Sequence, residues 1–145
     1  MRVVLDSNVL LASFGTHGLC EALVEECLER HVLVCSEHIL RELEKYLGGK
    51  FRVPAGEVRE IVRFVRERSD VAEPSDEPAD ACPDPDGLPV LGTAVAGSAD
   101  LLATGDAALL AMKVYKGIPI VTVRACYEQV SSGGPTPEVG RGRRK

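Results

Sequence analysis

Tryptophan is absent from this chain of 145 residues, and aromatic residues make up only 4% of it. Leucine, valine and alanine must therefore fill most of the core, and an apolar fraction of 45% is enough for that in a soluble globule. The length suits one domain, which at this size can bury about two-thirds of its unfolded surface without disulfide or metal support. We expect that domain to span residues 1–130.

Long hydrophobic runs and paired cysteines are also missing. No apolar stretch at the N-terminus is long enough for a signal peptide or a membrane span. The cysteines are odd in number, form no CxxC pair and lie mostly in apolar runs: Cys20, Cys27, Cys35, Cys82 and Cys126. This pattern excludes a disulfide framework and a zinc site, and it favours a protein of the reducing cytoplasm.

Basic residues are outnumbered by acidic ones outside the C-terminal end. The net charge is −5, and the last fifteen residues hold four cations against Glu138 alone, so the rest of the chain is more acidic than the total. We expect residues 131–145, rich in Ser, Gly, Pro and Arg, to form a disordered basic tail. An acidic body argues against a protein that coats nucleic acid passively. It is compatible with a metal-dependent nuclease, in which a bound cation neutralises clustered acids.

Short apolar runs alternate with stretches of helical periodicity along the chain. The runs that predict buried strands are 2–6, 32–35, 100–104 and 118–122, with a short edge strand near Val71. The stretches that predict helices are 18–30, 36–47, 54–68, 88–98, 106–112 and 125–130. Strands that alternate with helices in this way predict an α/β sandwich with a mainly parallel sheet.

Acidic residues follow the ends of several predicted elements. Asp6 ends the first strand, and Asp106 follows the third. Glu42 lies on the helix after the second strand, at the edge of its apolar face, whereas Asp84 and Asp86 flank a proline just before a helix of small residues. Ligand sites in parallel sheets lie beyond the carboxyl ends of the strands. We therefore expect these acids to gather at one end of the sheet.

A cluster of carboxylates points to a divalent cation. Like charges held close together raise one another's pKa unless a cation compensates them, and Mg²⁺ or Mn²⁺ prefers oxygen ligands. Such an ion can bridge to a phosphate and lower the pKa of a bound water for in-line attack. The histidines, His17, His31 and His38, are scattered along the chain, and we interpret them as surface or hydrogen-bonded residues rather than ligands.

Each acid also has a purely structural interpretation. Asp6 can cap a turn, Glu42 can be one of several solvated acids on its helix, and Asp106 is a good N-cap. Asp84 and Asp86 lie in a loop that is rich in acids and prolines. The metal hypothesis therefore depends on the joint order of these acids along the chain rather than on any one of them.

Four segments together resemble the PIN domain family, in particular the VapC-like toxin components of toxin–antitoxin pairs. The segments are Leu5-Asp6-Ser7-Asn8, Ser36 to Leu43 with Glu42, Asp84-Pro85-Asp86, and Ala99 to Asp106 with its Thr104-Gly105-Asp106 end. The resemblance covers about residues 2–130. It implies a three-layer α/β/α sandwich with a mainly parallel sheet, and Mg²⁺- or Mn²⁺-dependent endonucleolytic cleavage of single-stranded RNA.

The resemblance also implies catalytic roles for five acids. Asp6 would be the first metal ligand, and Glu42 would be the acid from the second helix. Asp84 or Asp86 would fill the third acidic position, and Asp106 the last. Apart from Glu42, these acids would hold the metal.

Two further residues would support the acids, again by resemblance. Asn8 would orient Asp6 through a hydrogen bond, and Thr104 would support Asp106 or contact the scissile phosphate. The resemblance implies partners as well. These are single-stranded RNA, a cognate antitoxin whose segment crosses the acidic groove, and a second copy of the chain in a homodimer or higher homo-oligomer. No membrane partner is expected.

One departure from the family pattern leaves alternatives open. Gly87 occupies a position where relatives carry another metal-binding Asp, so either Asp86 substitutes through a one-residue loop shift or the site is weakened. A weakened PIN domain that binds RNA or a partner without cutting is the second hypothesis. A third is a phosphatase that forms an aspartyl phosphate, but that chemistry needs a second Asp where Asn8 stands. Basic residues expected to contact RNA are Arg41, Lys45, Lys50 and Arg52.

Overall fold

The computed structural model describes residues 1–15 and 18–132, where six strands form one sheet in the order β3-β2-β1-β4-β6-β5. The strands are β1 (Arg2–Leu5), β2 (Val32–Cys35), β3 (Asp70–Val71), β4 (Leu101–Ala103), β5 (Val114–Tyr115) and β6 (Ile118–Val121). Neighbouring strands run parallel, except that β5 is antiparallel to β6. The predicted α/β class and mainly parallel sheet are confirmed. The predicted tail lies, from residue 133 on, outside the described residues.

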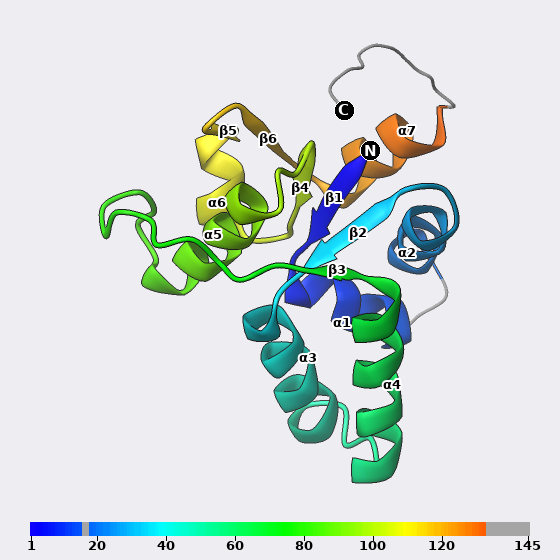
Figure 1. The fold of residues 1–145 in the computed structure, drawn as a ribbon. Coiled ribbons are helices and arrows are strands. Elements are labelled where there is room, and N and C mark those ends of the chain that lie inside the picture. Colours follow the sequence, from blue (N-terminus) through cyan, green and yellow to red (C-terminus); the bar gives the residue numbers. More distant parts are fainter. Residues whose placement is uncertain (16–17, 133–145) are drawn as a thin grey trace.

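Helices cover both faces of this sheet, as Figure 1 shows, with α5 and α6 on one side and α2 and α7 on the other. The helices are α1 (Ser7–Gly15), α2 (Leu19–Arg30), α3 (Glu37–Gly49), α4 (Ala55–Arg68), the 3₁₀ turn η1 (Pro85–Gly87), α5 (Leu88–Ala96), α6 (Ala107–Met112) and α7 (Val123–Ser131). The result is the expected three-layer sandwich. No helix in the described ranges is both long enough and apolar enough to cross a membrane.

The sequence analysis missed strand β5. Its two residues are too short for a detectable pattern, and the turn that joins it to β6 consists of Lys116 and Gly117, both with positive φ (48° and 81°). Two positive φ values in a two-residue loop are typical of a type I′ hairpin turn, which matches the twist of the paired strands. Lysine instead of the usual asparagine concealed this turn in the sequence.

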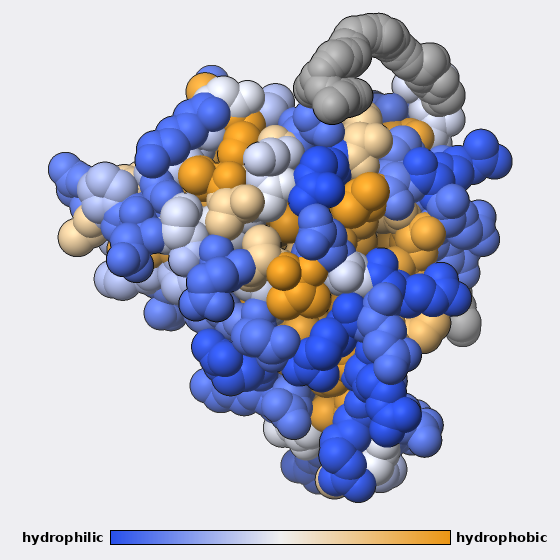
Figure 2. All heavy atoms as spheres, in the orientation of Figure 1, coloured by the Kyte–Doolittle hydropathy of each residue, from blue (hydrophilic) through white to orange (hydrophobic). Residues whose placement is uncertain are grey.

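The core is aliphatic, as the shortage of aromatic residues predicted. The buried hydrophobic side chains of the described residues are Leu, Val, Ile, Ala and Cys, with no Phe or Tyr among them. The cysteines are free thiols, and burial raises the pKa of Cys27 and of Cys126 to about 12 each, so these two behave as small apolar residues. The outer side of α4, at the bottom of Figure 2, is hydrophilic because its valines Val58, Val62 and Val65 face inward.

Helix α5 approaches its neighbours unusually closely, which explains its small residues. A Cβ atom at Gly97, which directly follows the helix, would lie 2.3 Å from Val34 of β2, and one at Gly92 would lie 2.3 Å from the carbonyl oxygen of Ser75. Real Cβ atoms do not approach so closely, so only glycine fits at these two positions. The small residues of the 88–98 segment are therefore explained by this close packing.

A hydrogen-bonded carboxylate fastens the acidic loop that precedes α5. The side chain of Glu77 is only 1% exposed and pairs with Lys116 at 2.9 Å. It also accepts hydrogen bonds from the hydroxyls of Ser75, at 2.7 Å, and Tyr115. These three partners, Ser75 first, lower the pKa of Glu77 to about 2. The loop is thereby attached to the β5–β6 hairpin.

Replacing Glu77 with Gln is expected to lower the free energy of unfolding at neutral pH by about 1–3 kcal/mol, the scale of hydrogen bonds to charged groups. Because folding lowers the pKa of Glu77, its stabilisation is fully present above the ordinary value of 4.5 and disappears as the pH falls towards about 2. Urea denaturation of both proteins at neutral and acidic pH measures the difference. A difference that does not shrink on acidification would contradict this role.

Candidate active site

The order of strands in the sheet reverses between β1 and β4. Strand β1 is followed in sequence by β2 on one side, whereas β4 lies on its other side, with Leu5 beside Ala103. The amide of Asp6 continues this pairing by donating to the carbonyl of Ala103 at 3.0 Å. Ligands of open α/β sheets bind at such a reversal, beyond the carboxyl ends of the strands. The sheet thus places Asp6 and Thr104 at the favoured position for a ligand site.

Asp6 is a buried carboxylate, only 7% exposed. Its Oδ1 accepts a hydrogen bond from the amide of Ser7, and its Oδ2 accepts one from the hydroxyl of Thr104, both at 2.7 Å. Burial raises the pKa of Asp6, the two hydrogen bonds lower it in part, and the nearby charges of Glu42 and Asp106 raise it further. The surroundings of Asp6 therefore disfavour the ionised form of its carboxyl group.

Thr104 connects Asp6 to Asp106. Its hydroxyl oxygen accepts a hydrogen bond from the amide of Asp106 at 3.0 Å while its proton is donated to Asp6. The Asp106 carboxylate accepts from the amide of Leu109 at 2.9 Å and so caps α6. The structural interpretation of Asp106 as an N-cap is correct.

Glu42 reaches the site from α3, a helix capped by Ser36 at the end of β2. Its Oε1 accepts a hydrogen bond from the hydroxyl of Ser7 at 2.8 Å. Its Oε2 lies 3.6 Å from Nε2 of His38, a buried atom with no hydrogen-bond partner in the described residues. The sequence analysis gave Ser7 no role in the site. It interpreted His38 as a surface or hydrogen-bonded residue, which is wrong for its Nε2 because that atom is buried without a hydrogen-bond partner in the described residues.

One cavity of about 350 Å³ brings the candidate residues together. Among its lining residues are all five candidate acids and Asn8: Asp6, Asn8, Glu42, Asp84, Asp86 and Asp106. Thr104 is not in the lining but lies buried behind Asp6. The hydrogen bonds that orient Asp6 come from Ser7 and Thr104, whereas Asn8, expected to do so, is exposed beside Gly105.

Asp86 lies in the 3₁₀ turn η1, Asp84 directly precedes it, and both are exposed. Asp84 caps this turn by accepting from the amide of Asp86 at 3.0 Å. Across residues 1–15 and 18–132, no three acidic, histidine or cysteine side chains already stand at the spacing of a metal site. A cation at this cavity would therefore require the exposed carboxylates to rotate towards Asp6.

The donor set of the cavity nevertheless fits a hard divalent cation. Its candidate ligands are carboxylates, which Mg²⁺ and Mn²⁺ favour over nitrogen or sulfur. Each oxygen of Asp6 accepts one hydrogen bond and retains a further lone pair. A cation would also relieve the repulsion that Glu42 and Asp106 exert on Asp6.

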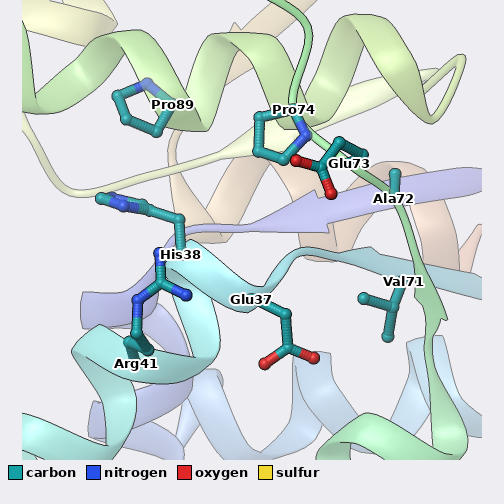
Figure 3. Close-up of a pocket in the computed structure, with 8 residues that line it drawn as sticks. All are labelled: Glu37, His38, Arg41, Val71, Ala72, Glu73, Pro74 and Pro89. Atoms are coloured by element: carbon teal, nitrogen blue, oxygen red, sulfur yellow. The ribbon is translucent and has the colours of Figure 1, made fainter.

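A second cavity, of about 600 Å³, lies near the first turn of α3. Figure 3 shows Glu37, His38 and Arg41 of this helix on one side of the cavity and Pro74 of the acidic loop and Pro89 of α5 on the other, with the Glu37 carboxylate pointing away from the two prolines. Glu37 is occupied by an ion pair with Arg66 at 2.8 Å. Arg41, which we expected to contact RNA, thus lines this second cavity, whereas Lys50 lines the carboxylate cavity.

A three-layer sandwich with a cavity of carboxylates at the strand reversal defines the class of protein. The model of the PIN domain family matches residues 2–108, a span that contains every candidate acid. The chain belongs to the PIN domain family.

Comparison with known proteins adds a match of fold. A chain in the crystal structure of VapBC2 from Rickettsia felis bound to a DNA fragment from their promoter superposes with a TM-score of 0.60. The match covers 84% of this chain and 98% of that chain at 14% identity, so it shows a shared fold. No curated protein matches the sequence.

Gly87, where the family pattern led us to expect an acid, is tightly packed. A Cβ atom there would lie 2.9 Å from Sγ of Cys82 and 3.3 Å from the side chain of Leu109, both of them buried. An acid at this position would need a different packing of those two residues. The presence of glycine instead of an acid at position 87 is therefore linked to the packing of Cys82 and Leu109.

Gly87→Asp is expected to lower the free energy of unfolding by about 1–3 kcal/mol, the usual result of adding atoms to a packed site. The loss should be smaller in a Cys82→Ala background, because the sulfur that the new Cβ meets is then gone. Urea denaturation of the two single variants and the double variant measures this coupling. Equal losses in both backgrounds would show that Cys82 does not restrict this position.

Proposed function

We propose that this PIN domain is a divalent-metal-dependent endonuclease that cleaves single-stranded RNA. The observation that carries the proposal is the Asp6 carboxylate, which is buried, has a raised pKa and faces the further negative charges of Glu42 and Asp106. Such an arrangement opposes ionisation, and carboxylates held in this way are typical of functional sites. A bound cation would compensate the repulsion between these carboxylates.

Asp6 and Asp106, with Asp84 or Asp86, would hold Mg²⁺ or Mn²⁺ in the cavity. When bound, the ion polarises a phosphate and lowers the pKa of a water molecule for in-line attack. The residues of the chain position the ligands of the ion. The Ser7 amide and the Thr104 hydroxyl fix the Asp6 carboxylate in one orientation, which keeps its two oxygens in place as ligands.

Glu42 is the residue we assign to proton transfer. Its Oε1 is held by the Ser7 hydroxyl, which fixes the side chain, whereas its Oε2 accepts no hydrogen bond from the described residues. An oxygen that is oriented but free can accept a proton from an attacking water. Nε2 of His38, 3.6 Å away, is close enough to receive that proton from Glu42 in turn.

The biological role we propose is that of the toxin in a toxin–antitoxin pair. The shared fold with a chain of VapBC2 supports it, together with membership of the PIN family. On this proposal the chain acts in the cytoplasm as a homodimer or higher homo-oligomer, and a cognate antitoxin silences it by covering the acidic groove. The free cysteines of the described residues suit that reducing compartment.

A second candidate function is a PIN domain that binds RNA or a partner without cutting. The packing around Gly87 favours it, because the position offers no room for the additional acid. The two candidates share the fold and the cavity, and they differ in whether Asp84 or Asp86 completes the metal site.

Asp6→Asn is expected to reduce metal-dependent cleavage of single-stranded RNA about 100-fold or more, because losing even an outer partner of a metal ligand costs roughly 10- to 100-fold. Asp76→Asn, the same change at an exposed acid outside the cavity, should cleave like the parent protein. The measurement is the cleavage rate of the purified chain with Mn²⁺ or Mg²⁺, beside a chelator control. Thermal unfolding checks that each variant is folded.

Two outcomes would contradict the proposal that this cavity is the active site of a metal-dependent nuclease. Cleavage that survives Asp6→Asn or chelation would come from another site or a contaminant. RNA binding without any metal-dependent cleavage by the parent protein would favour the second candidate, a PIN domain that does not cut.

A further inference from the structure

The aromatic residues of this chain are scarce, yet few of them are used for the core. All three phenylalanines and Tyr46 are between 39% and 41% exposed: Phe14, Phe51, Phe64 and Tyr46. An exposed aromatic ring in a protein whose core is aliphatic is an informative departure from the usual distribution. Whether an exposed ring can bind a ligand of the carboxylate cavity depends on how close the ring lies to that cavity.

Three of these rings lie where α1 and α3 end. Phe51 packs on the last turn of α1, since a Cβ atom at Gly15 would lie 2.8 Å from its ring, and Phe14 is the adjacent residue. The amide of Phe51 in turn bonds the carbonyl of Tyr46 at 3.1 Å. Of the three, Tyr46 also lines the carboxylate cavity.

One face of α3 carries an acidic residue, this tyrosine and a basic residue in a row. Glu42, Tyr46 and Lys50 follow one another at four-residue spacing, so they share a face with a rise of about 6 Å per step. All three line the cavity. Lys50 directly follows α3 and still has helical angles, so its position continues the helix.

Two lysines lie near this tyrosine in the described part of the chain, Lys50 on the same helix face and Lys45 next to it in sequence. Lys50 forms no ion pair with any described residue, although acids line the same cavity. Lys45 lies over the Tyr46 ring, with its Nζ 5.5 Å from the ring centroid. An aromatic ring with cations nearby, at the edge of an acidic cavity, is suited to a ligand that has flat bases and negative phosphates.

We propose that Tyr46 stacks on a base of the single-stranded RNA and that Lys50 binds its backbone phosphate, so that α3 fixes the register of the strand at the carboxylate cavity. Stacking on exposed rings beside cations is how proteins hold single strands without reading their sequence. The inference rests on the proposed nuclease function and adds to it the residues that hold the substrate. A strand bound in this way passes directly from Lys50 to Glu42.

The test uses a short fluorescent single-stranded RNA of randomised sequence, bound in Ca²⁺ and monitored by anisotropy, with a gel to verify that it stays intact. Tyr46→Ala is expected to weaken binding about tenfold, whereas Tyr46→Phe, which keeps the ring, should bind within about twofold of the parent protein. Phe64→Ala is the matched control. Phe64 is equally exposed and lies 4.9 Å from a cation, Arg68, but it is not in the cavity lining.

Lys50→Gln tests the phosphate contact separately. Removing one phosphate contact to a single strand should reduce the slope of log affinity against log salt by about 0.7. An unchanged slope would mean that Lys50 does not contact the backbone. Cleavage in Mn²⁺ is measured on the same proteins, so that binding and catalysis are scored independently.

The outcomes separate this inference from the proposed function. If the parent protein binds and cleaves RNA but Tyr46→Ala binds equally well, the stacking assignment is wrong and the nuclease stands. If the parent protein neither binds nor cleaves, both fail. If Tyr46→Ala changes the oligomeric state in light scattering and leaves RNA affinity intact, the ring belongs to a contact between copies and the inference is overturned.

Discussion

The carboxylate of Asp6 is the constraint on which the rest of the site depends. It is buried at the end of β1, where an ionised group is unfavourable, and its two oxygens are fixed by the Ser7 amide and the Thr104 hydroxyl. The Ser7 amide is local to Asp6, whereas the Thr104 hydroxyl reaches it because β1 and β4 pair in parallel with Leu5 beside Ala103. The sheet register therefore determines the chemistry at its edge.

The surrounding elements deliver further charge to this fixed point. Helix α3 brings Glu42 within reach of Ser7, and the cap of α6 brings Asp106 to the same end. Both acids, like burial, raise the pKa of Asp6, so the fold packs together carboxylates that repel one another. A fold that holds such a cluster is expected to bind a cation, and the PIN family to which the chain belongs is consistent with a divalent one.

Sequence reasoning reached the fold because buried strands and strand-end acids have clear signatures. Asp6 and Asp106 were found from their positions after apolar runs, and the cap role of Asp106 from its residue type. The partners of Asp6 were less accessible, because the hydroxyl of Thr104 meets it only through strand pairing across the sheet. His38 was set aside because its proximity to Glu42 depends on which face of α3 turns inward. The tight packing at Gly87 depends on Cys82 and Leu109 and has no local sequence signal.

The most direct test of this account is the position of a bound cation. Anomalous scattering from crystals soaked in Mn²⁺ locates the ion without reference to activity. The account predicts a peak in contact with the Asp6 carboxylate, within the cavity shared with Glu42 and Asp106, and no such peak in the Asp6→Asn variant. A peak confined to the acids of the loop before α5, or none at all, would contradict the claim that Asp6 is the centre of a metal site.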